Sequence, residues 1–318
     1  MDAAPSANPF GEGSAGNWRR FVASSDGSGN APAEASAFAV HMLNMLCPPT
    51  LDVDIVSHCN LNCAACCHFS PIAEPSFLSP QDYARDLELL ARVEDVGKFF
   101  AAICLMGGEP LLHPELPAFI RITHELLPDA RVRVVTNGTL LDSASDSFWE
   151  AMLEPNTDML ITPYPIGLDY EALEERVRAR GVDVSVGGGL SASEEENYFL
   201  RTPLDETGSQ DATESFVACP LGGHTMQLLD GKIYPCNRGA LLDIVNERFG
   251  TSFAHEEGDY LALGEIGSVE ELDSFRRTPR PMCRYCASSI AERIPWHRSS
   301  CDAEEWLMRP DERFHPSA

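Results

Sequence analysis

Hydrophobic and polar positions alternate between strand-like and helix-like periods over residues 51–186. Short apolar or alternating runs predict five strands: Leu51–Val56, Phe99–Met106, Val132–Thr136, Met159–Thr162 and Val182–Val186. Apolar residues at helical spacing predict four helices between them: one opening at Ser79-Pro80, then Leu116–Leu127, Ser147–Leu153 and Tyr170–Ala179. Repeated strand–helix units are typical of an α/β fold, in which a parallel sheet carries helices on its outer face.

The strand–helix pattern stops near Gly187, and a different organisation follows it. Residues 191–218 are acidic and rich in Ser and Thr, which predicts a crossing loop or lid. Thr225–Leu229 and Lys232–Tyr234 flank Asp-Gly, the signature of a β-hairpin. We therefore expect a core domain over residues 47–190 and a second, smaller module over residues 219–318.

The N-terminal segment and the overall charge restrict what the chain can do. Residues 1–36 contain 25 Ala, Gly, Ser, Pro or Asn, so residues 1–46 are expected to form a disordered tail and lead-in. The net charge of −26 over 318 residues opposes binding to nucleic acid. No apolar run reaches the length of a membrane span or a signal peptide, so a cytoplasmic protein with no membrane partner is expected.

The eleven cysteines point to metal or redox chemistry, because a reducing cytoplasm does not maintain structural disulfides. Cys59, Cys63 and Cys66 form a Cys-x3-Cys-x2-Cys loop directly after the first strand. Three thiolates can hold a [4Fe–4S] cluster and leave one iron open for an exogenous ligand. A zinc site is the alternative, with His68 or Cys67 as the fourth ligand.

Polar or glycine-rich segments also follow the next three strands, at the sheet edge where sites form in parallel sheets. Gly107-Gly108-Glu109-Pro110 ends the second strand, where glycine lets backbone approach a ligand and Glu109 offers an acceptor for an ammonium group. Asn137 ends the third strand and Thr162 the fourth. Ordinary turn chemistry explains each of these last two residues equally well.

These motifs resemble the radical S-adenosylmethionine (radical SAM) superfamily over roughly residues 50–190. The resemblance implies a partial (β/α)6 barrel. It also implies that Cys59, Cys63 and Cys66 hold a [4Fe–4S] cluster whose open iron is ligated by S-adenosylmethionine. Gly107, Gly108, Glu109 and Pro110 would contact the methionine amino group, and Asn137 and Thr162 the ribose or carboxylate. The family usually has an aromatic residue where this chain has Ala65, and Phe69 is expected to replace its stacking contact.

The later cysteines form a second pattern. Cys219 and Cys236 flank the hairpin, and Cys283 and Cys286 form a Cys-x2-Cys pair, so together they supply four thiolates. Four thiolates saturate either an iron–sulfur cluster or a zinc ion. The arrangement resembles the twitch module that follows many radical SAM barrels, which implies one auxiliary [4Fe–4S] cluster in a hairpin-containing module.

Four cysteines remain outside both sets. Cys104 lies within an apolar strand and is expected in the core, Cys47 has no expected role, and Cys67 is a neighbour of the first loop. Cys301 precedes an expected helix over Ala303–Met308. It is either a surface thiol or a hydrogen-atom donor to a substrate radical.

The resemblance implies an enzyme that generates a 5′-deoxyadenosyl radical with electrons from a donor such as flavodoxin or ferredoxin. An auxiliary cluster can accept an electron, which favours dehydrogenation of a secondary alcohol to a ketone. The run Cys66–Pro71 resembles members that act on sugar-like substrates, so a carbohydrate-like or aminocyclitol natural product, as in antibiotic biosynthesis, is the expected substrate. The alternatives are an epimerase that uses Cys301, a sugar-acid decarboxylase, a peptide-modifying enzyme, and a non-catalytic metal scaffold.

Overall fold

The computed structural model describes residues 33–187 and 198–312. The expected tail up to residue 32 and the start of the expected lid, residues 188–197, lie outside the described residues. Helix α2, Ala33–Leu46, corrects the expectation of a disordered lead-in. Asn44 of this helix donates side-chain hydrogen bonds to the carbonyl oxygens of Pro220 and Gly222, at 2.9 and 3.2 Å, and so docks it on the C-terminal part of the chain.

An eight-stranded sheet forms the centre of the molecule, in the order β5-β4-β3-β2-β1-β7-β8-β9. Its strands are β1 (Thr50–Val56), β2 (Ala102–Gly107), β3 (Val132–Thr136), β4 (Thr157–Ile161), β5 (Asp183–Val186), β7 (Thr225–Leu229), β8 (Lys232–Tyr234) and β9 (Leu261–Ala262). Strands β1–β5 are parallel to their neighbours, and β7 pairs in parallel with β1. The α/β fold class is confirmed, and the sixth parallel strand comes from the hairpin.

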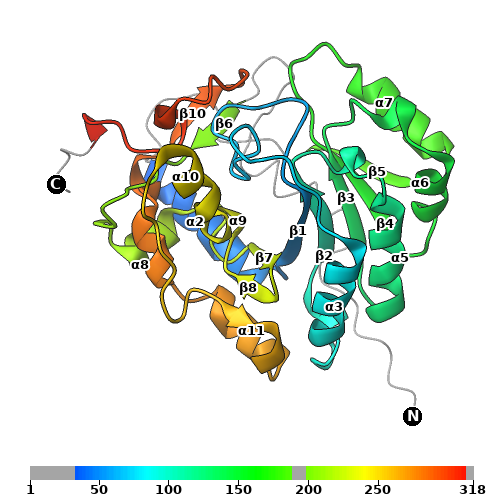
Figure 1. The fold of residues 1–318 in the computed structure, drawn as a ribbon, viewed down its shortest axis with the longest axis horizontal. Helices are drawn as coiled ribbons and strands as arrows, with labels where there is room; N and C mark the ends of the chain where they lie inside the picture. The colour runs from blue at the N-terminus through cyan, green and yellow to red at the C-terminus, as the bar shows by residue number, and fades with distance from the viewer. Residues whose placement is uncertain (1–32, 188–197, 313–318) are drawn as a thin grey trace.

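Helices cover the outer face of the parallel strands (Figure 1). They are α3 (Pro80–Leu90), α4 (Val96–Phe99), α5 (Leu116–Leu126), α6 (Asp146–Ala151) and α7 (Tyr170–Ala179). Alternate strand residues, such as Leu51, Val53 and Ile55 of β1, are buried in the core beneath them. Helix α3 begins as expected, because the Ser79 hydroxyl accepts a hydrogen bond from the Asp82 N–H at 3.0 Å.

The predicted hairpin is confirmed with its expected turn. Leu229 pairs with Lys232, and Asp230 and Gly231 adopt positive φ angles of 49° and 72°, as the tight turn requires. The hairpin was expected in a separate module, yet β7 bonds to β1 of the main sheet. The second hydrophobic core, which includes Phe69, Leu204, Tyr285 and Trp306, therefore packs beside the barrel sheet and shares residues with the cysteine loop.

The C-terminal part contains more regular structure than the sequence indicated. Its helices are α8 (Ala212–Ala218), α9 (Asn237–Ala240), α10 (Leu242–Phe249) and α11 (Val269–Arg276), and β6 (Tyr198–Arg201) pairs antiparallel with β10 (Glu292–Pro295). Short 3₁₀ helices complete the described chain: η1 (Pro110–Leu112), η2 (Leu141–Ser143), η3 (Leu263–Glu265), η4 (Pro281–Tyr285), η5 (Ser288–Ile290) and η6 (Ala303–Glu305). Among the described residues, no helix is long and apolar enough to cross a membrane.

Three boundary predictions were wrong for identifiable reasons. The second strand starts at Ala102, because Val96–Phe99 forms a helical turn after Asp95 adopts φ 58°. The lid over residues 191–218 contains β6 and α8 instead of a plain loop. The helix over Ala303–Met308 is only the turn η6, because the Met308 N–H bonds to the Leu204 carbonyl at 2.9 Å and draws the chain away from a helical path.

Candidate radical site and cysteine groups

The loop after β1 carries Cys59, Cys63 and Cys66 at the carboxyl end of the sheet. Left-handed backbone at Asn62 and Ala65, with φ 52° and 54°, wraps it tightly. Burial, together with the neighbouring Cys66 and Cys59 thiols, raises the pKa of the Cys63 thiol to about 12, although the hydrogen bond from Trp296 opposes this rise. Burial likewise raises the pKa of Cys59. The structure therefore brings the three thiols within mutual electrostatic range.

Several N–H groups point at these sulfurs. The Leu61 backbone N–H donates to Cys59 Sγ at 3.4 Å, and the Asn137 amide donates to the same sulfur at 3.7 Å. The indole Nε1 of Trp296 donates to Cys63 Sγ at 3.1 Å. Among the described residues, no three His, Cys, Asp or Glu side chains are spaced to hold a single metal ion. Three cysteines that would repel one another as free thiolates, with N–H donors directed at two of their sulfurs, fit an anionic iron–sulfur cluster, in which each thiolate binds a different iron.

Two glycines bring the end of β2 against this loop. The Gly108 N–H bonds to the Val56 carbonyl at 2.7 Å, and the Glu109 N–H bonds to the His58 carbonyl at 3.0 Å. A Cβ on Gly108 would lie 1.8 Å from the His58 oxygen, so only glycine fits. The segment predicted to contact the methionine amino group therefore lies against the cysteine loop.

Glu109 is bound by the protein itself. The Thr136 hydroxyl donates to Oε1 at 2.6 Å, the Asn137 N–H to Oε2 at 2.9 Å and the Leu111 N–H to Oε1 at 3.1 Å. Burial raises the pKa of this carboxyl group. A carboxylate accepts about four hydrogen bonds, so roughly one acceptor position remains for a ligand. The main role visible for Glu109 is to tie the ends of β2 and β3 together.

Asn137 and Thr162 lie at the same edge of the sheet. The Asn137 amide donates to Asn60 Oδ1 at 2.8 Å, which links β3 to the cysteine loop. The Thr162 N–H bonds to the Thr136 carbonyl at 2.9 Å, and its side chain is half-buried. The structure thus brings all the residues predicted around the first site to one end of the parallel strands.

The second set of cysteines comes from three separate segments, and its thiols lie within electrostatic range of one another. Cys219 follows α8, Cys236 caps α9 and accepts from the Gly239 N–H at 3.4 Å, and Cys283 and Cys286 lie on and just after η4. Burial and the Cys219 thiol raise the pKa of Cys283 to about 11, and burial with the Cys219 and Cys283 thiols raises that of Cys286 to about 12. The pKa of Cys236 is raised by burial and by all three partners.

Residues 202–211 brace the turn that carries Cys283 and Cys286. The Asp205 N–H bonds to the Tyr285 carbonyl at 2.7 Å, and Leu204 forms a β-bridge with Cys286. Asp205 itself accepts from Thr207, Ser209 and Gln210. Part of the segment predicted as a lid is therefore internal support for the second cysteine group.

A buried polar residue next to Cys236 in the sequence contacts Cys67 and His68, just after the first cysteine loop, and sequence reasoning missed it. The Asn237 amide donates to Cys67 Sγ at 3.4 Å and lies 2.9 Å from His68 Nε2. His68 Nδ1 lies 2.8 Å from Asp54 Oδ2. Although burial opposes it, the adjacent His68 lowers the pKa of Cys67 to about 7. Asn237 directly follows Cys236, so its position beside a predicted ligand was the available signal.

The C-terminal residues 292–312, here called the C-terminal strap, run along the first cysteine loop. Cys301 lies in this strap, half-buried and with φ 62°, and its thiol contacts the Pro71 carbonyl at 3.5 Å. The predicted stacking role of Phe69 is wrong, because Phe69 is 0% exposed in the second core. The aromatic residues near the thiols are instead Tyr164 and Trp296, whose rings lie 6.2 Å apart.

Comparison with known proteins agrees with this geometry. Residues 53–185 match the family model described as the Radical SAM superfamily. The parallel sheet and the cysteine loop at its carboxyl edge thus define a radical SAM domain. The chain therefore carries a radical SAM domain over these residues, and members of that superfamily use a [4Fe–4S] cluster and S-adenosylmethionine and need a reductant.

The curated relatives share one printed name. GTP 3′,8-cyclase of Microcystis aeruginosa is 34% identical over 105 residues, which is 32% of this chain and 31% of that protein. The Chlorobaculum tepidum protein of that name is 33% identical over 102 residues, 32% of this chain and 29% of its own length. The chain therefore spans about three tenths of the length of these relatives.

Two solved structures show a more distant likeness. BtrN in complex with AdoMet and 2-DOIA has a TM-score of 0.47 at 19% identity, covering 74% of this chain and 92% of that one. Streptococcus suis SuiB bound to S-adenosylmethionine has a TM-score of 0.35 at 16% identity, covering 44% and 33%. At these scores the likeness does not bear on the substrate.

Proposed function

We propose that this radical SAM enzyme dehydrogenates a secondary alcohol of a carbohydrate-like or aminocyclitol substrate to a ketone. The observation that carries the proposal is the set of four thiols, Cys219, Cys236, Cys283 and Cys286, which raise one another's pKa. Asn237, the residue after Cys236, donates to the Cys67 sulfur next to the first loop. Four thiol ligands fit a saturated cluster, which would supply an electron acceptor. The division into a barrel over residues 47–190 and an auxiliary module over residues 219–318 remains part of this proposal.

When bound at Cys59, Cys63 and Cys66, the cluster and S-adenosylmethionine supply a 5′-deoxyadenosyl radical. The chain's own residues hold the cysteine loop in place. Gly107 and Gly108 allow the close approach of β2, and Glu109 fixes the ends of β2 and β3. A substrate carbon radical next to a hydroxyl group becomes a ketone when it loses one proton and one electron. The reaction therefore needs an electron sink and no hydrogen donor.

Charge supports a cationic or neutral substrate over a polyanionic one. The chain carries a net charge of −26, which repels a nucleoside triphosphate and attracts an amine-bearing sugar or cyclitol. The relatives' name includes GTP, but the matches cover between about a third and a half of this chain. GTP is therefore the comparison substrate in the test and not the proposed one.

Epimerisation is the second candidate, and Cys301 is the observation in its favour. The Cys301 thiol lies on the strap over the cysteine loop, at 3.5 Å from the Pro71 carbonyl. A thiol near a substrate radical can return a hydrogen atom. The four half-buried thiols of the second group already fit an electron acceptor, however, and an epimerase has no need of one. Dehydrogenation accounts for both cysteine groups.

The test uses full-length enzyme reconstituted anaerobically with iron and sulfide. The wild type should bind about eight irons, and the triple variant of Cys59, Cys63 and Cys66 to Ala about four, with no 5′-deoxyadenosine formed. The quadruple variant of Cys219, Cys236, Cys283 and Cys286 to Ala should retain the other four and lose the ketone product. Zinc bound to the second group would remove the electron-acceptor role. Cys47→Ala, at an exposed thiol, is the matched control.

Product analysis in D2O distinguishes the reactions. An aminocyclitol, a neutral cyclitol and GTP are supplied separately, and 5′-deoxyadenosine and product mass are followed. A ketone two mass units lighter than the substrate, formed equally by Cys301→Ala, supports the proposal. A product carrying one deuterium that depends on Cys301 would establish the epimerase instead. Turnover of GTP alone would refute the proposed substrate class.

A further inference from the structure

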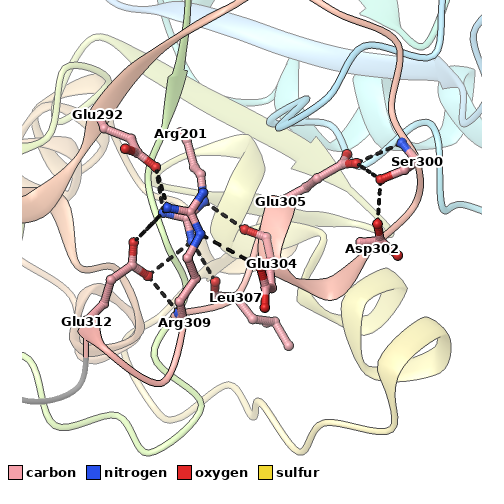
Figure 2. Close-up of polar contacts among 9 residues, drawn as sticks. All are labelled: Arg201, Glu292, Ser300, Asp302, Glu304, Glu305, Leu307, Arg309 and Glu312. Carbon is pink, nitrogen blue, oxygen red and sulfur yellow. Dashed lines mark hydrogen bonds and ion pairs between the residues drawn. The ribbon is translucent and has the colours of Figure 1, made fainter.

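The C-terminal strap is held in place by a buried arginine (Figure 2). Arg201 of β6 is 1% exposed, and its guanidinium bonds to Glu292 at 3.0 Å and to Glu312 at 2.7 Å. It also donates to the backbone carbonyls of Glu304 and Leu307, each at 2.8 Å. One side chain therefore anchors the strap at several points along its length.

The anchored strap runs antiparallel to the first cysteine loop. The Ala64 N–H bonds to the His297 carbonyl at 3.0 Å, the Ser299 N–H bonds to the Asn62 carbonyl at 2.7 Å, and Cys63 forms a β-bridge with Arg298. These bonds flank Cys63 on both sides. The strap is thus fixed relative to the sulfur of one predicted cluster ligand.

Within this frame, Trp296 contacts the Cys63 sulfur directly, with its indole Nε1 at 3.1 Å. Its ring packs near Tyr164, at 6.2 Å between centroids. A second tryptophan of the strap, Trp306, also donates to the cysteine loop, but its Nε1 bonds to the Cys66 carbonyl oxygen at 3.0 Å. The two indoles thus make hydrogen bonds of similar length to the same loop, and only one of them reaches a sulfur.

We infer that Trp296 is a positioning residue that sets the reduction potential of the catalytic cluster through its N–H···S bond to Cys63. The inference rests on the proposed ligation of the cluster by Cys63. Reduction adds negative charge to a cluster and its sulfur ligands, so an N–H donor stabilises the reduced state and raises the potential. The residue comes from the far end of the chain, more than 200 positions after the loop that it serves.

Trp296→Phe isolates this bond, because phenylalanine keeps an aromatic ring beside Tyr164 and removes the donor. Trp306→Phe is the matched control, since it removes an indole N–H from the same loop without touching a sulfur. Both variants are reconstituted as full-length protein. Iron content and the reduction potential of the S-adenosylmethionine-binding cluster are then measured by redox titration with electron paramagnetic resonance detection.

We expect Trp296→Phe to keep its iron and to show a lower cluster reduction potential than the wild type. Trp306→Phe should have the same cluster reduction potential as the wild type. At a fixed strength of reductant, a smaller fraction of the Trp296→Phe cluster is then reduced. An unchanged potential with a full iron complement overturns the inference. Equal shifts of the reduction potential in both variants also overturn the inference, because they would mean that either substitution loosens the whole strap.

Failure of the proposed function gives a different result. If Cys59, Cys63 and Cys66 hold no cluster, the wild type itself lacks the corresponding paramagnetic signal and about four of its irons. If the cluster is present but the substrate class is wrong, the potentials are still measurable without any substrate. The Trp296 comparison is therefore independent of which alcohol the enzyme oxidises.

Discussion

At the scale of residues, the absence of a Cβ atom at Gly108 allows the end of β2 to meet the first cysteine loop. The end of β2 and the cysteine loop after β1 are bonded backbone to backbone, through Val56 and His58. The space for a side chain at Gly108 is already filled by the His58 carbonyl. The glycine pair is therefore required by the contact between two strand ends, besides any contact with a cofactor.

The variant Gly108→Ala should displace the cysteine loop from β2. Because the added Cβ would lie 1.8 Å from the His58 oxygen, backbone must shift by about an ångström. Formation of 5′-deoxyadenosine should fall about 100-fold, with the second cysteine group still binding its iron. Gly264→Ala is the control, since its Cβ would meet nothing within 4 Å. Wild-type rates for Gly108→Ala would show that the loop tolerates the shift.

At the scale of elements, the second cysteine group is held by pairing between segments far apart in sequence. Residues 202–211 bond to the turn with Cys283 and Cys286, and β6 pairs with β10. Arg238 of α9 is buried and donates to the Thr202 carbonyl, which places its positive charge near Cys219 and Cys286. Residues 202–211, here called the brace, and the second cysteine group therefore form one unit.

Asp205 in this brace should contribute a pH-dependent part of the stability. Burial alone would raise its pKa, but hydrogen bonds from Gln210, Ser209 and Thr207 lower it to about 2 from 3.8. A lowered folded-state pKa stabilises the protein above pH 4, and this stabilisation is lost as pH falls toward 2. Asp205→Asn should therefore lower the free energy of unfolding by about 2 kcal/mol, equally from pH 8 to pH 5.

Denaturant unfolding at several pH values measures this difference. Asp142→Asn is the control, because that side chain is 80% exposed and its removal should cost less than about 0.5 kcal/mol. A difference that grows between pH 8 and pH 5 would contradict the assignment of the low pKa to Asp205.

At the scale of the whole molecule, the strap joins the C-terminus to the radical site, and Arg201 is its anchor. Arg201→Met should lower the free energy of unfolding by about 3 kcal/mol, because it removes the guanidinium that binds the half-buried Glu312 carboxylate and two backbone carbonyls. Amides of the strap and of residues 59–72 should exchange hydrogen faster together, since the strap is bonded to that loop.

Arg309→Met is the control for this prediction. Arg309 binds the same two carboxylates, Glu292 and Glu312, but its side chain is 37% exposed, so its loss should cost about 0.5 kcal/mol. Hydrogen exchange followed by mass spectrometry provides the measurement. Faster exchange of the strap alone, with residues 59–72 unchanged, would mean that the strap does not support the cysteine loop.

Local pattern was enough to predict the parallel strands and the residues at their ends. Strand periodicity and turn chemistry act between near neighbours, so Leu51–Val56, the Asp230-Gly231 turn and the loop from Cys59 to Cys66 could be read directly. The spacing of Cys219, Cys236, Cys283 and Cys286 likewise predicts one group, and in the structure the other three thiols all act on the pKa of Cys236.

Only the tertiary structure decided which distant segments meet at the site. Phe69 is adjacent to the cysteine loop in sequence, yet it is fully buried in the second core, while Trp296 reaches Cys63 from the other end of the chain. Strand β7 pairs with β1, and part of the predicted lid pairs with the turn that carries Cys286. In both cases pairing with a distant segment satisfies backbone hydrogen-bonding groups. Such contacts depend on the packing of the whole chain, so the local pattern of hydrophobic residues cannot predict them.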